Sequence, residues 1–343
     1  MATQLEDLLL EVLRKKTGCP GLRYAAPPLP VAGGFWAQIL AVRLEGAPPE
    51  LDRDLIVRIM PDPDAAKRET IVQSEVVAQG FPAPPVRLVG GPDDGLGRAF
   101  MVMDRMPGRP PVPEVTGPAA FAALGRAATR LPDLLADTTA RLHALDPEPL
   151  RRALIEEGTT VVLPGDLLRV VGERAAGADR PDLARAAQRM AADPPARGRE
   201  VICHGDLHPF NLLVEGRRVS VIDWSVALIG DPAFDLAFTA LTMAAAPIAV
   251  PRVLRRPVRA AARSGSRWFL RSYRKRVPGA ADSLREDVLD WFTAVHCLRA
   301  LVELAQWVAA GTVDEQAGHP WLVMAPNMAV HLGKVVGDDV RPM

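Results

Sequence analysis

The stretch of sequence that decides the fold runs from residue 201 to residue 237 and reads VICHGDLHPFNLLVEGRRVSVIDWSVALIGDPAFDLA. Two strand-like runs within it are joined by the turn Glu215–Arg218, a pattern that predicts a hairpin. Asp206 and Asn211 lie at or just before the first strand, and Asp223 directly follows the second. We therefore expect these three side chains at one end of a sheet. Two carboxylates and an amide oxygen there offer hard ligands for Mg²⁺ and a base for a hydroxyl proton.

The same three residues have a plainer interpretation, because Asp and Asn are common in turns. Their joint spacing favours a site: Asn211 follows Asp206 by five positions, and Asp223 follows Asn211 by twelve. Of the two histidines in the motif, His204 is expected to support the loop backbone. His208 is open between a structural and an active-site role, since histidine commonly satisfies a local hydrogen bond.

Other polar residues around the motif are expected to be structural. Asp231 and Asp235 come at the start of a predicted helix, where carboxylates cap the helix or anchor a loop. His143 lies on an apolar helix face, and Cys203 lies on a buried strand before the motif, so both are expected to pack in the core.

Composition limits the class of protein. The chain has 343 residues, of which 48% are hydrophobic, and its 41 Lys and Arg balance 41 Asp and Glu. This excludes a disordered chain and indicates two domains or one enzyme of two lobes. A net charge of zero makes a nucleic-acid partner unlikely by composition. The three cysteines are far apart and lack CxxC spacing, so neither a disulfide framework nor a zinc site is indicated.

The order of periodic segments predicts an α+β architecture. Residues 1–105 form a β-rich lobe, with strands at 35–44, 54–60, 86–89 and 99–103 and a single internal helix at 63–79, after an amphipathic helix at 3–16. Residues 106–343 form a larger, mainly helical lobe, with helices at 118–146, 180–192 and 290–310. The polar motif is embedded in this second lobe.

We expect a cytoplasmic protein with no membrane span. The N-terminus lacks the basic start and apolar run of a signal peptide. The apolar run Leu236–Val250 is shorter than the ~20 residues that a bilayer span requires.

With these motifs in view, the sequence resembles the aminoglycoside phosphotransferase-like family, a branch of the protein-kinase-like fold. The resemblance covers most of the chain in the expected order. It rests on HGDLHPFN, IDW and GDPAFDLA within 201–237 and on four weaker matches: Pro30–Gly34, Leu55–Arg58, Phe100–Gly108 and Leu142–Pro147. It implies a bilobal fold, a nucleotide donor (ATP or GTP), Mg²⁺ and a small-molecule hydroxyl acceptor.

The resemblance also implies a role for each matching residue. Asp206 would accept the proton of the acceptor hydroxyl, while Asn211 and Asp223 would hold Mg²⁺. The nucleotide would be bound by the Gly33-Gly34 loop, by Arg58 held by Glu69, and by the hinge backbone from Asp104 to Met106.

One departure from the family pattern concerns the strand cation. Between Lys16 and Lys67 there is no lysine, so Arg58 is the best available phosphate-binding cation. Arginine keeps the charge and grips phosphate bidentately, but it is bulkier. Glu75 competes with Glu69 as its partner, although the spacing to Pro82 favours Glu69.

Residues 252–276 contain ten basic and no acidic residues, and the recurrence from Arg255 to Arg271 at every fourth position predicts a stripe on a helix. The stripe is either a solvated face or a rim that attracts anions. A rim would favour a metabolic kinase acting on hydroxy acids or hydroxyacyl esters over an antibiotic (aminoglycoside or macrolide) O-phosphotransferase. It would also suit an anionic membrane surface or nucleic acid.

Two questions stay open from the sequence. A kinase-like nucleotide-binding protein with little activity remains a second hypothesis, motivated by Arg58 and by Phe35 and Trp36 beside the glycine pair. The acceptor and the oligomeric state are not indicated by any motif.

Overall fold

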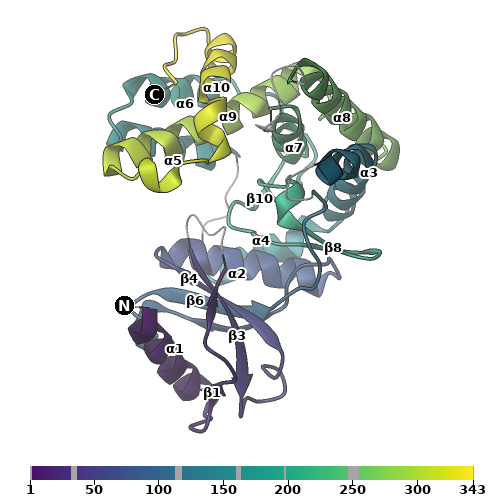
Figure 1. The fold of residues 1–343 in the computed structure, drawn as a ribbon. Coiled ribbons are helices and arrows are strands. Elements are labelled where there is room, and N and C mark those ends of the chain that lie inside the picture. The colour runs from purple at the N-terminus through teal and green to yellow at the C-terminus, as the bar shows by residue number, and fades with distance from the viewer. Residues whose placement is uncertain are drawn as a thin grey trace. The chain divides into compact units, whose positions relative to one another are not determined.

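Antiparallel pairing of the N-terminal strands builds a six-stranded sheet in the order β1-β3-β4-β6-β5, with β2 also paired to β3 (Figure 1). The computed structural model describes residues 2–31, 37–112, 118–159, 164–196, 198–245 and 255–342. The six strands are β1 (Arg23–Tyr24), β2 (Leu29–Pro30), β3 (Gln38–Glu45), β4 (Asp54–Met60), β5 (Val86–Gly90) and β6 (Ala99–Asp104).

The two faces of this sheet bury different helices. Alternation along β4 and β6 turns Leu55, Val57 and Val102 toward α1 (Ala2–Thr17), in one apolar cluster with Leu9 and Leu13. The opposite face carries smaller side chains and methionines. It packs against α2 (Pro63–Ala78), where Ala66 meets Met60 and Met101. Arg58 lies on this second face because its neighbours in β4 point the other way.

The chain separates into two units, neither of which is continuous in sequence. The first contains residues 1–110, 148–160 and 211–226, and the second contains residues 111–147, 161–210 and 227–343. The first unit thereby includes the helix α4 (Pro147–Glu156) and the hairpin β8 (Leu212–Glu215) and β9 (Arg218–Val221). Arg109 pairs with Val214 of this hairpin through two backbone hydrogen bonds of 3.2 and 2.8 Å.

The second unit is built around the helix α9 (Glu286–Ala310), which is buried on most of its surface. Its core contains Phe234, Trp291 and Leu301 and is closed by helices before and after α9. The other helices of the unit are α3 (Pro118–Leu142), α5 (Pro164–Gly177), α6 (Pro181–Ala192), α7 (Ala233–Ala245), α8 (Arg255–Arg276) and α10 (Pro320–Val336). The short strands β7 (Val201–Cys203) and β10 (Leu228–Gly230) pair antiparallel.

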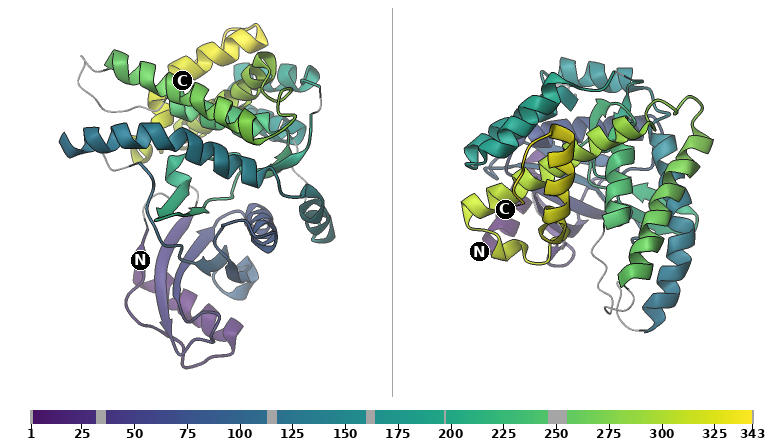
Figure 2. Two further views of the ribbon diagram at one scale, coloured as in Figure 1. Left: turned by 90° about the vertical axis from the view of Figure 1, so that its right-hand side faces the viewer. Right: turned by 90° about the horizontal axis from the view of Figure 1, so that it is seen from above.

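Helices α3, α7 and α8 pack side by side, as both panels of Figure 2 show. The helix predicted from the arginine-rich stretch therefore forms, and neither Pro257 nor Gly265 interrupts it between Arg255 and Arg276. Pro257 lies in the first turn, where a missing N–H costs nothing.

Most of the predicted helices and strands are present, including the short strands at 86–89 and 99–103, but several other elements were missed. The helix expected at 3–16 is α1, that at 63–79 is α2, and the strand at 54–60 is β4. The sequence did not indicate β1, β2 and β10, whose pairing is set by long-range contacts, nor the helices α4 and α5. In the described part of the chain, no helix is both long and apolar enough to cross a membrane.

Substitution of Gly108 tests how closely the segment after β6 packs against the β8–β9 hairpin. Its φ is +107°, and a Cβ there would lie 2.8 Å from the carbonyl carbon and oxygen of Val214. Gly108→Ala should lower the free energy of unfolding by roughly 2 kcal/mol or more, measured by urea denaturation. Gly97→Ala is the matched control, because Gly97 has φ +68° but open space around it; its cost should stay at about 1 kcal/mol. Equal effects of the two substitutions would contradict the steric argument.

Candidate active site

Arg58 is the centre of a buried charge cluster in the first unit. Its guanidinium lies 3.4 Å (Nε to Oε1) from Glu69 on α2 and 3.1 Å (Nη2 to Oδ1) from Asp223 after β9. Arg58 and Glu69 are only 6% and 4% exposed, so both charges are nearly removed from water. Glu69, rather than Glu75, is thus the α2 glutamate that meets the strand cation; Glu75 accepts a hydrogen bond from Gln79 instead.

Burial and charge act in opposite directions within this cluster. Burial would lower the pKa of Arg58, but the carboxylates of Glu69 and Asp223 outweigh it and raise that pKa above its ordinary value. Burial raises the pKa of Glu69 to about 7, although the Arg58 charge and the backbone N–H of Trp224 pull it down. The Arg58–Glu69 contact is an ion pair without hydrogen-bond alignment, since Arg58 Nε and Glu69 Oε1 lack a hydrogen-bond partner in the described structure. Arg58 therefore remains a cation, flanked by the side chains of Glu69 and Asp223.

The β8–β9 hairpin brings Asn211 and Asp223 to one end, as the sequence predicted. The backbone N–H of Ile222 donates to the Asn211 carbonyl at 3.0 Å, next to the Leu212–Val221 pair. Asp223 has φ +65°, an uncommon conformation for a residue with a side chain. Its Oδ1 accepts from Arg58 and from Ser225 Oγ at 2.8 Å. A carboxylate and a carboxamide oxygen at one hairpin end are the donors that Mg²⁺ prefers.

The hinge residues are held largely by the sheet. The Asp104 carboxylate accepts two hydrogen bonds from Arg87, of 2.7 and 2.6 Å, so its side chain is structural. The backbone N–H groups of Asp104 and Arg105 donate to Pro85 and Asp54. Among the described residues, no backbone hydrogen bond of Met106 accompanies these two, so its predicted contact with a nucleotide base stays a prediction. The predicted phosphate loop, Gly33 and Gly34, lies outside the described residues.

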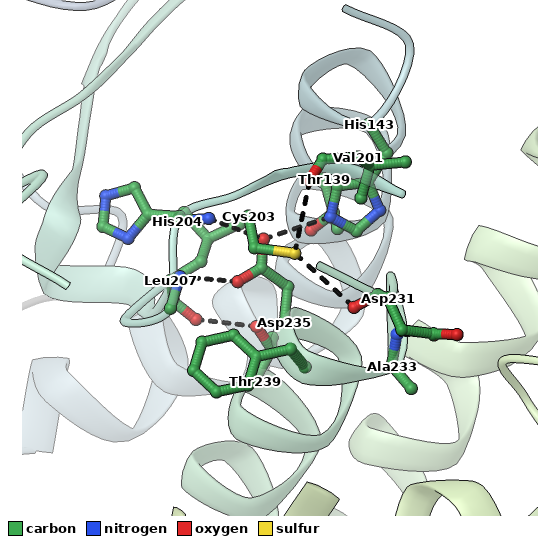
Figure 3. A network of polar contacts seen from close by, with 12 residues as sticks. Thr139, His143, Val201, Cys203, His204, Leu207, Asp231, Ala233, Asp235 and Thr239 are labelled. Atoms are coloured by element: carbon green, nitrogen blue, oxygen red, sulfur yellow. Dashed lines mark hydrogen bonds and ion pairs between the residues drawn. The ribbon is translucent and has the colours of Figure 1, made fainter. Parts of the chain in front are cut away.

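The loop that carries Asp206 belongs to the second unit and is anchored by Asp235. Oδ2 of Asp235 accepts from the backbone N–H of His204 at 2.9 Å, and Oδ1 accepts from that of Gly205 at 2.6 Å (Figure 3). Asp235 is completely buried in the first turn of α7. His204 Nδ1 in turn accepts from the Asp206 N–H at 3.2 Å, which agrees with its expected role as a loop support.

A second histidine completes this anchor. His143 Nε2 lies 3.1 Å from Asp235 Oδ2, and its Nδ1 lies 2.8 Å from the Tyr273 hydroxyl. Burial would raise the pKa of Asp235, but the hydrogen bond and charge of His143, the charge of His204 and the Gly205 amide lower it below its ordinary value. The fixed carboxylate is therefore ionised and keeps the loop backbone in place.

His143, Cys203 and Asp235 have potential metal-ligating atoms within 4.8 Å of one another. Both nitrogens of His143 and both oxygens of Asp235 are already hydrogen bonded. Burial, with the Asp235 and Asp231 charges, raises the pKa of the Cys203 thiol, which stays protonated. These groups form a hydrogen-bonded anchor, not a metal centre, and His143, Cys203 and Asp235 have the core and anchoring roles expected of them.

Arg299 holds the other side of the same glycine. Its Nη1 donates to the Gly205 carbonyl at 3.3 Å and to His296 Nδ1 at 2.9 Å. His296 Nε2 donates to the Phe234 carbonyl at 2.7 Å, and burial lowers the pKa of His296 to about 3, so this imidazole is neutral. Gly205, with φ +76°, thus has its N–H fixed by Asp235 and its C=O fixed by Arg299. No sequence pattern indicated this contact, because 94 positions separate Arg299 from Gly205.

Several titratable groups surround the Asp206 carboxylate. His208 Nε2 lies 3.6 Å from Asp206 Oδ2, and its Nδ1 accepts from the Phe210 N–H, so the protonated nitrogen faces Asp206. The pKa of Arg299 is lowered by burial and by the Arg174 charge and raised by Asp206 and Glu303. Asp206 therefore interacts electrostatically with Arg299 of α9, and Arg299 in turn is close enough to feel the charge of Arg174 of α5.

The predicted site residues thus fall into two clusters. Arg58, Glu69, Asn211 and Asp223 come together in the first unit. Asp206 lies in the second unit, five positions before Asn211 in the chain. The roles predicted for them in binding and catalysis stay predictions.

Comparison with known proteins identifies the class. Residues 29–263 match the family model of the phosphotransferase enzyme family (APH), which is more than half of the chain. The chain belongs to this family, and the α+β kinase-like fold expected from the sequence is confirmed.

The sequence identity to individual known proteins is low. A segment of 194 residues is 30% identical to acyl-CoA dehydrogenase family member 11 of Gallus gallus, covering 52% of this chain but only 23% of that protein. The GDP complex of an aminoglycoside 2′-phosphotransferase-IIIa variant aligns with TM-score 0.60 and 16% identity, over 95% of this chain and 99% of that one. A ternary complex of aminoglycoside phosphotransferase APH(4)-Ia with ADP and hygromycin B aligns with TM-score 0.56 and 15% identity, over 96% and 98%.

Arg299 is the residue whose substitution tests the loop geometry. Arg299→Met removes the donor to the Gly205 carbonyl, so amide hydrogen exchange of residues 204–208, followed by mass spectrometry, should accelerate by about tenfold or more. Arg299→Lys is the matched variant: it keeps one charged donor and should recover part of the protection. Unchanged exchange in both variants, with unfolding still cooperative, would contradict a positioning role for Arg299.

Proposed function

We propose that this protein transfers the γ-phosphoryl group of ATP or GTP to a hydroxyl group of a small molecule. The observation that carries the proposal is the Arg58 guanidinium held between Glu69 and Asp223 in a chain of the phosphotransferase enzyme family. The ADP and GDP in the solved structures of its relatives support the choice of donor.

In this proposal each cluster has its own task. Arg58 binds the nucleotide phosphates, and Glu69 keeps the guanidinium in place, while the Met106 peptide binds the base. Mg²⁺, held by Asn211 and Asp223, would neutralise phosphate charge. Asp206 orients the acceptor hydroxyl and accepts its proton; its backbone is fixed by Asp235 and Arg299 on either side of Gly205. Since phosphoryl transfer depends mainly on positioning and charge, these groups suffice.

We further propose an acceptor with a carboxylate, phosphate or acyl-ester group, in preference to a polycationic aminoglycoside. The support comes from Arg299, whose charge interacts with Asp206 and Glu303, and from the Arg174 charge that acts on Arg299. An antibiotic with several amines would meet two arginines there. The acyl-CoA dehydrogenase family relative also supports an acyl acceptor.

Substitution of the proposed base is the direct test. Asp206→Asn should reduce phosphotransfer by a factor of about 10² to 10⁴, the usual contribution of a general base, while Mg·ATP and Mg·GTP still raise the unfolding temperature. Full phosphotransfer in this variant would exclude Asp206 as the base. Nucleotide binding by the wild type without turnover across a broad hydroxyl panel would instead support a kinase-like binding protein.

The acceptor class is tested by a phosphotransfer screen with aminoglycosides, macrolides, hydroxy acids and hydroxyacyl-CoA esters. Arg174→Gln should raise the KM for an anionic acceptor about fivefold to tenfold and leave the nucleotide KM unchanged. Arg169→Gln, on the same helix but paired with Glu173, is the matched control and should change neither value. Turnover confined to aminoglycosides or macrolides would overturn the anionic assignment.

A further inference from the structure

The outer face of α8 carries a concentration of positive charge that the proposed phosphotransfer does not use. The helix contains nine basic and no acidic residues, and every basic side chain is exposed. Because the whole chain has 41 basic and 41 acidic residues, the acids outnumber the bases by nine outside this helix. The excess of positive charge is therefore concentrated on α8, whereas the rest of the chain has an excess of negative charge.

The helix has a buried face and a basic face. Phe269 and Tyr273 are fully buried, on the side where α8 packs against α3 and α7. At 100° per residue, six basic positions fall within an arc of about 120° roughly opposite that side. They are Arg256, Arg263, Arg267, Arg271, Arg274 and Lys275. We call these six residues the α8 basic face.

The charges of this face have no acidic partners in the part of the chain that the structure describes. Of the α8 side chains, Arg276 alone forms ion pairs among the residues that the structure describes, at 3.6 Å from both Asp133 and Asp137 of α3. No residue of the α8 basic face has an acidic side chain within 4.0 Å in the same described set. An anionic partner would therefore meet arginines that need not first break internal pairs.

Trp268 lies beside this face and is 42% exposed. A helix of 22 residues is about 33 Å long, so the basic face forms an extended and nearly straight strip. Arginines beside an amphipathic aromatic side chain match the headgroup layer of a bilayer, where anionic phosphates lie next to the acyl boundary. The apolar face of α8 is occupied by the protein core, which allows adsorption to a surface but not insertion of the helix.

We propose that the α8 basic face and Trp268 bind peripherally to a membrane surface rich in anionic lipids. Nucleic acid is disfavoured for two reasons. The chain as a whole has no basic excess. Within α8, Trp268 is the one exposed aromatic ring, because Phe269 and Tyr273 are buried, so the face has no series of rings on which bases could stack.

The test is co-sedimentation of the full chain with phosphatidylcholine vesicles and with vesicles containing about one third phosphatidylglycerol. Binding is expected to the second kind alone. It should fall at least tenfold when salt rises from roughly 0.1 M to roughly 1 M, because the Debye length shortens from about 10 Å to about 3 Å. Equal binding to both vesicles, or none at low salt, overturns the proposal.

Reversing the charge of residues on the α8 basic face tests whether this face is the membrane-binding surface. Arg263→Glu/Arg267→Glu should weaken vesicle binding at least tenfold, and Trp268→Ala should weaken it severalfold without changing charge. The control Arg98→Glu/Arg217→Glu reverses two exposed charges of the first unit and should bind as the wild type. If the reversal does not fold, Arg263→Gln/Arg267→Gln replaces it, with cooperative unfolding as the criterion.

Two outcomes would overturn the proposal at this stage. One is equal loss of vesicle binding in the control. The other is salt-dependent binding to a DNA duplex but not to vesicles, which would assign the face to nucleic acid. Binding of Mg·ATP, measured by thermal shift, should be unchanged in every variant, so a failure of this proposal is distinguishable from a failure of the proposed phosphotransfer.

Discussion

A buried carboxylate is the constraint on which the loop around Asp206 depends. Asp235 has no contact with water, and its two oxygens are bonded to the amides of His204 and Gly205 and to the imidazole of His143. An unpaired ion at this depth would cost several kcal/mol, so the charge persists only while these donors stay in place. The backbone that presents Asp206 is therefore fixed by the same bonds that make the buried charge tolerable.

The anchor extends beyond the segment itself. Tyr273 of α8 bonds to His143, so a helix whose outer side is basic contributes its inner side to the support of Asp235. Arg299 adds a bond from α9 to the Gly205 carbonyl. The backbone around Asp206 is thus determined by three helices of the second unit, α3, α8 and α9, besides the start of α7.

Local sequence information sufficed for the parts of the site that are close together in the chain. The hairpin that joins Asn211 and Asp223 was predictable because turn residues and strand runs within a dozen positions specify it. The choice of Glu69 over Glu75 was also predictable, since the resemblance to the family places the helix glutamate at this spacing before Pro82. The contact of Arg299 with the Gly205 carbonyl was not predictable, because it is determined by the packing of α9 and not by any nearby sequence pattern.

The arginine-rich stretch illustrates a different limit of sequence reasoning. Periodicity correctly predicted a basic helix, and its charge suggested a rim at the acceptor entrance. In the structure, α8 packs on α3 and α7, while Arg299, which interacts electrostatically with Asp206, belongs to α9. A pattern specifies which face of a helix is charged, but tertiary packing decides what that face meets.

The arginine in β4 has a practical consequence. Amine-directed acylating reagents react with lysine, whose ammonium group can lose its proton, and not with arginine. The β4 position offers a guanidinium that stays protonated at any ordinary pH. The chain has five lysines, and the one on α2, Lys67, is exposed and paired with Glu157. If nucleotide phosphates bind beside Arg58 as proposed above, an amine-directed acylating probe would find no lysine to modify on β4.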